Sequence, residues 1–284
     1  MEEFTLTATD GFPVSCALFE SSVPNDRKLS PSGIVQIIHG AKEYKERYYD
    51  FASFLASSGF IVVLSDLRGH GKSVNDEYPF GHMGRWQVLA NDIAMISNFA
   101  KTCFAEEDRM LPLTLFAHSF GSVLARCCLR QNDQVFSKLI MTGTVRCLSH
   151  AKYIVPLSKV IVSVQGGLKP AGFPLKYGEP LPIDQDCSVM KYSNTSVLTI
   201  WEANLAMQSA DWTAKKPYLS ILSLTCSDDP VTGGKHGLEE TAQHLYSQGY
   251  RNYRSITYPE SGHQPLMSGA RQQALEDIIS FLHE

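Results

Sequence analysis

The chain has 284 residues, of which 44% are hydrophobic and 19% are charged. This composition can build a full hydrophobic core, which excludes an intrinsically disordered chain. The net charge of −4 gives no basic excess, which disfavours a nucleic-acid-binding protein, and no apolar run approaches the ~18 residues that cross a membrane.

The N-terminal residues and the cysteines indicate the compartment. The start MEEFTLTATDGF has no basic stretch, no apolar stretch and no small-residue cleavage site, so we expect no secretory signal. The seven cysteines lack C-x-x-C spacing, which predicts free thiols in a reducing compartment. The sequence contains neither an H-E-x-x-H segment nor a paired Cys/His cluster, so no pattern in it indicates a zinc site. We therefore expect a cytoplasmic globular protein without a metal ion.

The first half of the chain alternates short apolar runs with longer helical patterns. In chain order, we expect a strand at 14–19, a strand at 34–38, a helix at 44–58, a strand at 60–64, a helix at 85–104, a strand at 113–116, a helix at 119–130 and a strand at 138–142. Such alternation predicts an α/β fold with a parallel sheet covered on both faces, in which ligands bind beyond the carboxyl ends of the strands.

The alternation stops at about residue 145 and resumes after residue 212. Prolines and glycines crowd this stretch, and its apolar runs predict helices at 154–164 and 197–208. Beyond it we expect a strand at 219–225, a helix at 238–246, a strand at 253–258 and a helix at 267–282. The sequence therefore predicts one α/β core made of residues 1–144 and 213–284, with residues 145–212 inserted as a cap.

The segment Ala117-His118-Ser119-Phe120-Gly121 lies between a predicted strand and a predicted helix. This is the setting of a nucleophile elbow, in which a serine adopts a strained turn that exposes its hydroxyl. Small residues must stand two positions before and after the serine, and Ala117 and Gly121 meet that condition. The plainer alternative is a tight turn with Ser119 as a helix N-cap. We favour Ser119 as a nucleophile.

A nucleophilic serine needs a base and an acid, which follow it in the chain order Ser, Asp/Glu, His. His263 lies on a loop after the last predicted strand. The acid lies directly after the strand at 219–225, where Asp228 and Asp229 compete. We prefer Asp229, because the following Pro230 holds it in an extended conformation; Asp228 could instead cap the loop backbone.

Two further loops follow predicted strands. An oxyanion hole needs two backbone N–H groups, and we expect them from Ala41, in the segment His39-Gly40-Ala41, and from Phe120, which follows the nucleophile. An ordinary glycine turn is the alternative. The loop from Asp66 to Ser73 lacks a full phosphate-binding pattern, so we expect it to be structural, with Arg68 or Asp66 fixing it.

The residues that resemble a known family are Ile38-His39-Gly40, Asp66-x-Arg68-Gly69-His70-Gly71-x-Ser73, Ala117-x-Ser119-x-Gly121, Asp229-Pro230 and Gly262-His263. In this order and spacing the chain resembles the α/β-hydrolase superfamily, and within it the lysophospholipases, monoacylglycerol lipases and serine-aminopeptidase-like hydrolases. The similarity covers nearly the whole chain and is weakest from about 145 to 212, where the superfamily carries its variable cap. Ala117 departs from the usual glycine but is small enough for the turn.

The resemblance implies an eight-stranded, mostly parallel sheet flanked by helices. It also implies a catalytic triad of Ser119, Asp229 and His263, and an oxyanion hole formed by the backbone of Ala41 and Phe120.

On this basis we expect a serine hydrolase that cleaves carboxylic esters through an acyl-enzyme, without a cofactor. Its expected substrate is a small-molecule ester such as a monoacylglycerol or lysophospholipid. The apolar residues of 154–164 line an acyl pocket or form the core of the cap itself. A thioesterase and a serine aminopeptidase are alternatives; the aminopeptidase would use an acidic residue of the cap to hold the substrate amine, and the candidates are Glu179, Asp184, Asp186 and Glu202. A non-catalytic binding protein on the same fold is the alternative of another class.

Overall fold

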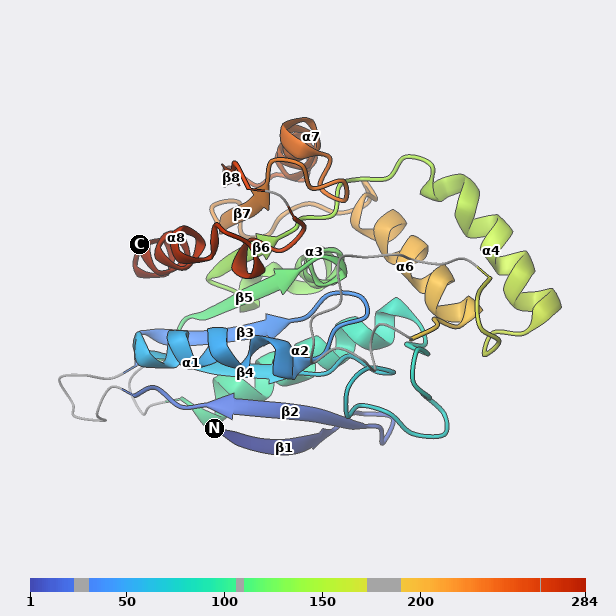
Figure 1. The fold of residues 1–284 in the computed structure, drawn as a ribbon, viewed down its shortest axis with the longest axis horizontal. Helices are drawn as coiled ribbons and strands as arrows, with labels where there is room; N and C mark the ends of the chain where they lie inside the picture. The colour runs from blue at the N-terminus through green and yellow to red at the C-terminus, as the bar shows by residue number, and fades with distance from the viewer. Residues whose placement is uncertain (23–30, 106–109, 173–189, 261) are drawn as a thin grey trace.

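A computed structural model of the protein describes residues 1–22, 31–105, 110–172, 190–260 and 262–284. Its centre is an eight-stranded sheet with the strand order β1-β2-β4-β3-β5-β6-β7-β8 (Figure 1). The strands are β1 Glu2–Thr7, β2 Pro13–Phe19, β3 Gly33–Ile38, β4 Phe60–Ser65, β5 Leu113–His118, β6 Lys138–Thr142, β7 Ser220–Cys226 and β8 Asn252–Tyr258. From β4 to β8 the pairs are parallel, whereas β1 and β2 run antiparallel to their neighbours. The predicted mostly parallel sheet is confirmed.

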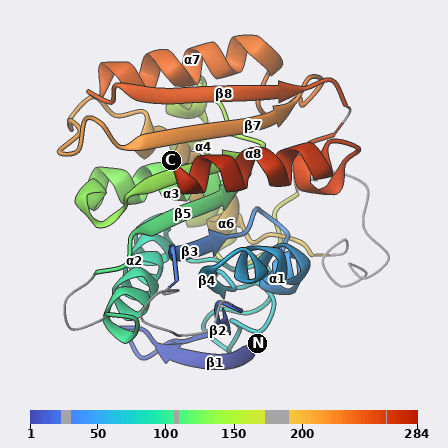
Figure 2. The same cartoon turned by 90° about the vertical axis from the view of Figure 1, so that its left-hand side faces the viewer.

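Helices cover both faces of the sheet. In the described residues they are α1 Tyr49–Ser57, α2 Trp86–Cys103, α3 Phe120–Asn132, α4 Ala151–Gln165, α6 Asn194–Met207, α7 Gly234–Ser247 and α8 Arg271–His283, with short 3-10 helices η1 Lys45–Tyr48, η2 Asp133–Val135 and η3 Pro265–Met267. Figure 2 shows α1 and α8 on one face of the sheet and α2 and α3 on the other. The α/β fold expected from the alternation of strands and helices is therefore observed.

Alternate side chains of the central strands contribute to two separate hydrophobic cores, one on each face of the sheet. On β3, Val35 and Ile37 join the cluster that packs α1 and α8 against the sheet. Ile34 and Ile38 of the same strand join the cluster beneath α2 and α3. Successive side chains of a strand point to opposite faces, so a strand that is apolar throughout needs helices on both sides.

Several elements differ from the sequence-based expectation, and three of these differences have a clear physical reason. The sequence did not predict the edge strand β1, because the residues of β1 are mostly exposed and polar and form no apolar run. The helix predicted at 267–282 is divided into η3 and α8, because Ser268 takes an extended conformation between them. The helix predicted from residue 119 begins one residue later, at Phe120, because Ser119 is not helical.

The segment between β6 and β7 lies beyond the carboxyl ends of the parallel strands. Figure 1 shows α4 and α6 on this side of the sheet, where α6 packs on α3 and α4 packs on α6. Residues 173–189 of this segment, including Glu179, Asp184 and Asp186, lie outside the described residues. Among the described residues, no helix is both long enough and apolar enough to cross a membrane.

Candidate active site

Ser119 stands in the sharp turn between β5 and α3. Its backbone has φ 51° and ψ −121°, a conformation that costs a non-glycine residue about 1–3 kcal/mol. The turn also brings two chain segments close together, because a Cβ atom added at Gly121 would lie 2.7 Å from the carbonyl oxygen of Ile38. The small side chain of Ala117 is fully buried. The strain and the steric limits of this turn are those of a nucleophile elbow.

The His263 imidazole lies between the other two residues that the sequence singled out. Its Nε2 atom is 2.7 Å from Ser119 Oγ, and its Nδ1 atom is 3.0 Å from Asp229 Oδ2. In this arrangement the Ser119 hydroxyl can donate to Nε2, while Nδ1–H donates to the carboxylate. The structure thus brings Ser119, His263 and Asp229, from three loops at the carboxyl edge of the sheet, into one hydrogen-bonded chain.

Asp229 and its neighbour Asp228 have different surroundings. Asp229 is 1% exposed and accepts hydrogen bonds from Thr232 Oγ1 at 2.7 Å and from Val231 N–H at 2.9 Å. Burial alone would raise the pKa of Asp229, but the hydrogen bond to His263 and these other donors outweigh it and hold the pKa below its usual value. Asp228 instead accepts the Gly262 N–H at 3.1 Å, on the loop that leads to His263.

The two amides expected to form an oxyanion hole border the same cavity as Ser119. Among the described residues, no hydrogen-bond acceptor is within reach of the backbone N–H of Ala41 or Phe120. Gly40 permits the close approach of this loop, because a Cβ atom there would lie 3.0 Å from Ser119 Cβ. Both amides can therefore donate to a group that enters beside Ser119.

Glu43 supports this loop, although no sequence pattern singles it out. Its Oε2 atom accepts the Gly40 N–H at 2.7 Å and the Tyr48 hydroxyl at 2.7 Å, and the side chain of Arg47 lies 3.3 Å from Oε1. The carboxylate is only 8% exposed. It therefore fixes the backbone directly before Ala41.

His118 packs beside His263 but is not part of the hydrogen-bonded chain of Ser119, His263 and Asp229. Its ring centroid is 4.8 Å from that of His263, while its Nδ1 atom is 3.1 Å from the Thr142 carbonyl oxygen. Burial, reinforced by the nearby His263, holds the pKa of His118 well below its usual value. His118 is therefore a neutral packing partner that adds no charge next to the base.

Tyr192, just before α6, is a second residue that the sequence did not point to. Its hydroxyl accepts the Lys42 N–H at 2.6 Å and lies 2.9 Å from His70 Nε2. Lys42 has a φ of 58°, so the backbone beside Ala41 is held in a left-handed conformation. Only the fold could reveal this contact, since Tyr192 and Lys42 are 150 positions apart.

The loop after β4 is structural, as the sequence predicts. Asp66 accepts hydrogen bonds from the Lys45 N–H at 2.7 Å and the Lys72 N–H at 2.9 Å, and it pairs with Lys45 Nζ at 2.9 Å. Arg68 pairs with Asp92 at 2.7 Å and with Asp10. Both residues that were expected to fix this loop do so.

A cavity of about 190 Å³ opens beside Ser119. Its apolar wall comes from α3, from the start of the segment after β6, from α6 and from the loop after Asp229; it includes Val123, Leu148, Val197, Ile200, Trp201 and Val231. None of the apolar residues at 154–164, which we expected to line an acyl pocket or to form the core of the cap, lines this cavity. Nor do they all form a core, since Leu157, Val160 and Val164 are 61%, 57% and 79% exposed. Among the described residues, α4 packs on α6, and these three residues lie on the side that remains exposed.

With this geometry established, the chain can be compared with known proteins. A family model described as serine aminopeptidase, S33, matches residues 30–268. The chain belongs to this family. The resemblance to the α/β-hydrolases that the sequence suggested is thereby confirmed, on the monoacylglycerol lipase-like branch.

Curated relatives match shorter parts of this S33-family chain. A phospholipase, YtpA, of Bacillus subtilis is 33% identical over 34% of the chain and 33% of its own length. A monoglyceride lipase homolog of Monkeypox virus is 26% identical over 49% of the chain and 47% of its own length. A monoacylglycerol lipase of Mycolicibacterium smegmatis is 23% identical over 56% of the chain and 54% of its own length. The matched region thus spans about a third to a half of these relatives.

Solved structures match over nearly the full length. A thermostable carboxyl esterase from Bacillus coagulans superimposes with a TM-score of 0.81 at 22% identity, covering 99% of this chain and 97% of that one. A monoacylglycerol lipase of Paleococcus ferrophilus gives a TM-score of 0.70 at 18% identity, covering 99% and 98%. At these sequence identities, the similarity to the two solved structures establishes the fold of the chain.

The S33 family description raises the question of a site for a substrate amine. Of the four acidic residues that the sequence offered for this role, Glu202 is the one within the described residues. It lies on α6 and pairs with Lys159 of α4 at 3.0 Å. Glu202 does not border the cavity beside Ser119. In the described part of the chain, no cluster of His, Cys, Asp or Glu side chains has the arrangement of a metal site.

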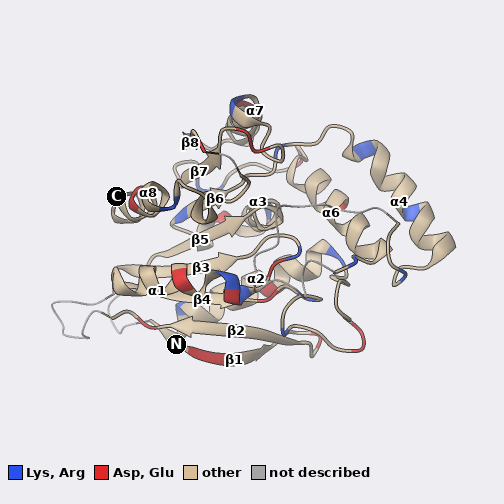
Figure 3. Ribbon diagram, in the orientation of Figure 1, with Lys and Arg blue, Asp and Glu red and all other residues tan. Residues whose placement is uncertain are grey.

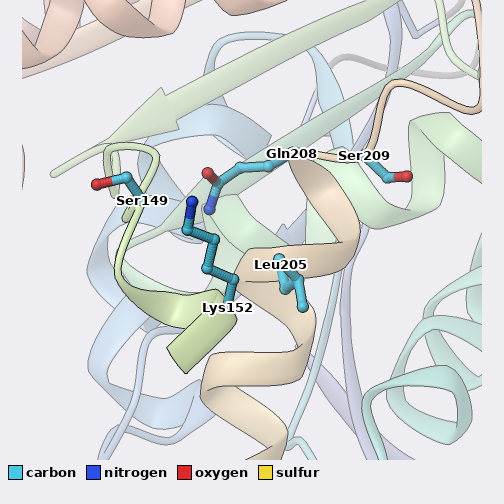
Figure 4. Close-up of a pocket in the computed structure, with 5 residues that line it drawn as sticks. All are labelled: Ser149, Lys152, Leu205, Gln208 and Ser209. Carbon is cyan, nitrogen blue, oxygen red and sulfur yellow. The ribbon is translucent and has the colours of Figure 1, made fainter. Parts of the chain in front are cut away.

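A wider depression of about 370 Å³ lies away from the triad (Figure 4). It is lined by Ser149, Lys152, Leu205, Gln208 and Ser209, at the start of α4 and the end of α6. The Gln208 amide already donates to the Asn204 carbonyl at 3.0 Å. The chemistry of this S33-family chain is therefore to be sought at the smaller cavity, which contains Ser119.

Proposed function

We propose that the protein is a serine hydrolase that cleaves carboxylic esters through an acyl-enzyme. The observation that carries this proposal is the position of the His263 imidazole, within hydrogen-bond distance of both the Ser119 hydroxyl and the Asp229 carboxylate. The S33 family and the presence of phospholipases and monoacylglycerol lipases among the relatives support it.

Each group has a defined part in the reaction. His263 Nε2 takes the proton of Ser119 as Oγ attacks the ester carbonyl, and Asp229 stabilises the imidazolium that forms. The amides of Ala41 and Phe120 donate to the oxyanion, and one such donor contributes about 3–4 kcal/mol. His263 then protonates the departing alcohol. Water repeats the sequence on the acyl-enzyme, which releases the acid and restores Ser119.

The substrate we propose is a small ester with an acyl chain, such as a monoacylglycerol or lysophospholipid. The apolar wall of the cavity beside Ser119 favours an acyl group, and residues 145–212 act as a cap over the core of residues 1–144 and 213–284. An aminopeptidase finds less support, because Glu202 is paired with Lys159 and stands outside the cavity wall. Rates on esters, thioesters and aminoacyl amides of matched size separate these activities.

The nucleophile is tested by Ser119→Ala. A fluorophosphonate probe should label the wild-type protein at Ser119 and leave the variant unlabelled, and ester turnover should fall by about 10⁶-fold. The control is Ser57→Ala, which removes an exposed hydroxyl on α1 and should keep full labelling. Undiminished turnover in folded Ser119→Ala would overturn the mechanism, and absence of labelling and turnover in the wild type would favour a non-catalytic binding protein.

A further inference from the structure

Arg146 brings a positive charge to a cavity that is otherwise lined by apolar and uncharged residues. It follows β6, borders the same cavity as Ser119, and is the only charged residue among the described residues that line it. Its side chain is half-buried. A guanidinium at the wall of an apolar cavity loses part of its hydration, so it interacts strongly with any anion that enters.

Arg146 also differs in its partners from three arginines that form ion pairs. Arg68 pairs with Asp92, Arg130 with Asp211 and Arg254 with Glu284. Within the described residues, the Arg146 side chain has neither a carboxylate at ion-pair distance nor a hydrogen-bond acceptor. Its charge is therefore available to a ligand in the cavity.

The backbone around Arg146 is held in place from two sides. Asn204 of α6 donates to the Arg146 carbonyl oxygen at 3.2 Å and accepts the Leu148 N–H at 3.1 Å. Ser122 of α3 accepts the Val145 N–H at 3.1 Å. Since these contacts fix the main chain, the Arg146 side chain extends from a rigid base beside the cavity, which lowers the entropy lost when it binds a ligand.

The side chain of Arg146 lies against the first turn of α7, where none of the described carboxylates pairs with it. A Cβ atom added at Gly233 would meet Arg146 Nη1 at 3.1 Å, and one added at Gly237 would meet Arg146 Cβ at 3.5 Å. The first turn of α7 contains no Asp or Glu, and the positive end of a helix dipole lies there. Asp229, which precedes this turn, is already bonded to His263 and Thr232.

We propose that Arg146 binds an anionic group of the substrate, a carboxylate or a phosphate, while Ser119 attacks the ester carbonyl. This rests on the proposed function and narrows its substrate class to carboxylic esters that carry a negative charge close to the scissile bond. Carboxylate and phosphate share the paired oxygens that match the two parallel N–H donors of a guanidinium. Arg146 is thus a residue that determines specificity and takes no part in the proton transfers.

Two pairs of substrates test this class and locate the charge. The first pair, p-nitrophenyl hexanoate and mono-p-nitrophenyl adipate, differs by a terminal carboxylate on the acyl group. The second, octanoylglycerol and octanoylglycerol phosphate, differs by a phosphate on the leaving group. For each pair the readout is the ratio of kcat/KM for the anionic ester to that for the neutral ester.

In Arg146→Gln this ratio should fall by about 10- to 100-fold for at least one pair, through a higher KM for the anionic ester. Arg146→Lys, which keeps the charge without the planar fork, should give an intermediate ratio. The matched control is Lys235→Gln, which removes a positive charge from the same turn of α7. The Lys235 side chain is 89% exposed, so the ratio of kcat/KM values in this variant should stay within about twofold of the wild-type ratio. The pair that responds identifies an acyl-side carboxylate or a headgroup phosphate as the recognised group.

An unchanged ratio in Arg146→Gln for both pairs would overturn the proposal while leaving the serine mechanism intact. Equilibrium binding tests the Arg146 proposal even if the serine mechanism is wrong, because binding needs no turnover. Calorimetry on Ser119→Ala should show that mono-p-nitrophenyl adipate or octanoylglycerol phosphate binds at least tenfold more tightly than its neutral partner. The double variant with Ser119→Ala and Arg146→Gln should bind the anionic and the neutral ester equally well. Equal binding of both members of each pair would also overturn the proposal.

Discussion

The carboxyl edge of the sheet and the segment from 145 to 212 are built in different ways. At the sheet edge, Ser119 and Asp229 follow strands that are buried on both faces, and hydrogen bonds of 2.7 Å and 3.0 Å join them to His263. In the second region, as far as the residues are described, α4 packs on α6 and turns apolar residues outward. The basic residues that Figure 3 shows on α4 are Lys152 and Lys159. Packing on both sides fixes reacting groups, whereas a helix packed on one side can vary its outer surface without disturbing them.

The largest effect should come from the fixed region, at Asp229. Asp229→Asn keeps the shape of the side chain but removes the negative charge that stabilises the imidazolium and selects its tautomer. We expect kcat for ester hydrolysis to fall by about 10³- to 10⁴-fold. Steady-state kinetics on a p-nitrophenyl ester measure this.

The adjacent residue is the control. Asp228→Asn keeps an oxygen that can accept the Gly262 N–H, so kcat should change by less than about tenfold. A larger loss in Asp228→Asn than in Asp229→Asn would reverse the assignment of the acid.

The difference in packing between the core helix α1 and helix α4 is tested by a Leu→Ala substitution in each helix. Leu55 of α1 is fully buried, so Leu55→Ala should lower the free energy of unfolding by about 2–5 kcal/mol. Leu157 of α4 is 61% exposed, so Leu157→Ala should change it by no more than about 0.5 kcal/mol. Urea unfolding measures both. A loss above about 2 kcal/mol in Leu157→Ala would mean that this face of α4 is covered, and the contrast between the two regions would fail.

The smallest effect should arise where the two regions meet, at Tyr192. Tyr192→Phe removes the oxygen that accepts the Lys42 N–H at 2.6 Å, beside the proposed oxyanion amide of Ala41. We expect a loss of stability of about 1 kcal/mol and a decrease of about three- to tenfold in kcat. Tyr258→Phe is the control, since its hydroxyl bonds to Asp277 at 2.8 Å on α8. It should lose similar stability and keep its kcat; an unchanged kcat in Tyr192→Phe would show that the contact does not position the amide.

Much of the fold and of the candidate site follows from local patterns. The run Ile34-Val35-Gln36-Ile37-Ile38 predicted most of β3, because β-branched residues between turns favour a buried strand. Ser119, His263 and Asp229 could be chosen because each follows a strand, and parallel strands end at one edge. The identity of Asp229 as the member bonded to His263 required the fold, although its place before Pro230 favoured it.

Other features depend on contacts that no local pattern contains. Tyr192 and Glu43 look like ordinary polar residues until the fold brings them to the loop of Ala41. The outward direction of Leu157 and Val164 depends on which side of α4 meets α6, and the apolar run itself is compatible with either orientation. Arg146 gave no signal because its importance comes from the cavity that it borders.

The hydrogen bond from Ser119 to His263 joins positions 144 residues apart. Under the proposed mechanism, a nascent polypeptide therefore has no hydrolytic competence until β7 and β8 have docked. Reactivity towards a serine-directed label should thus report on complete folding, because changes that separate these loops should register as lost labelling.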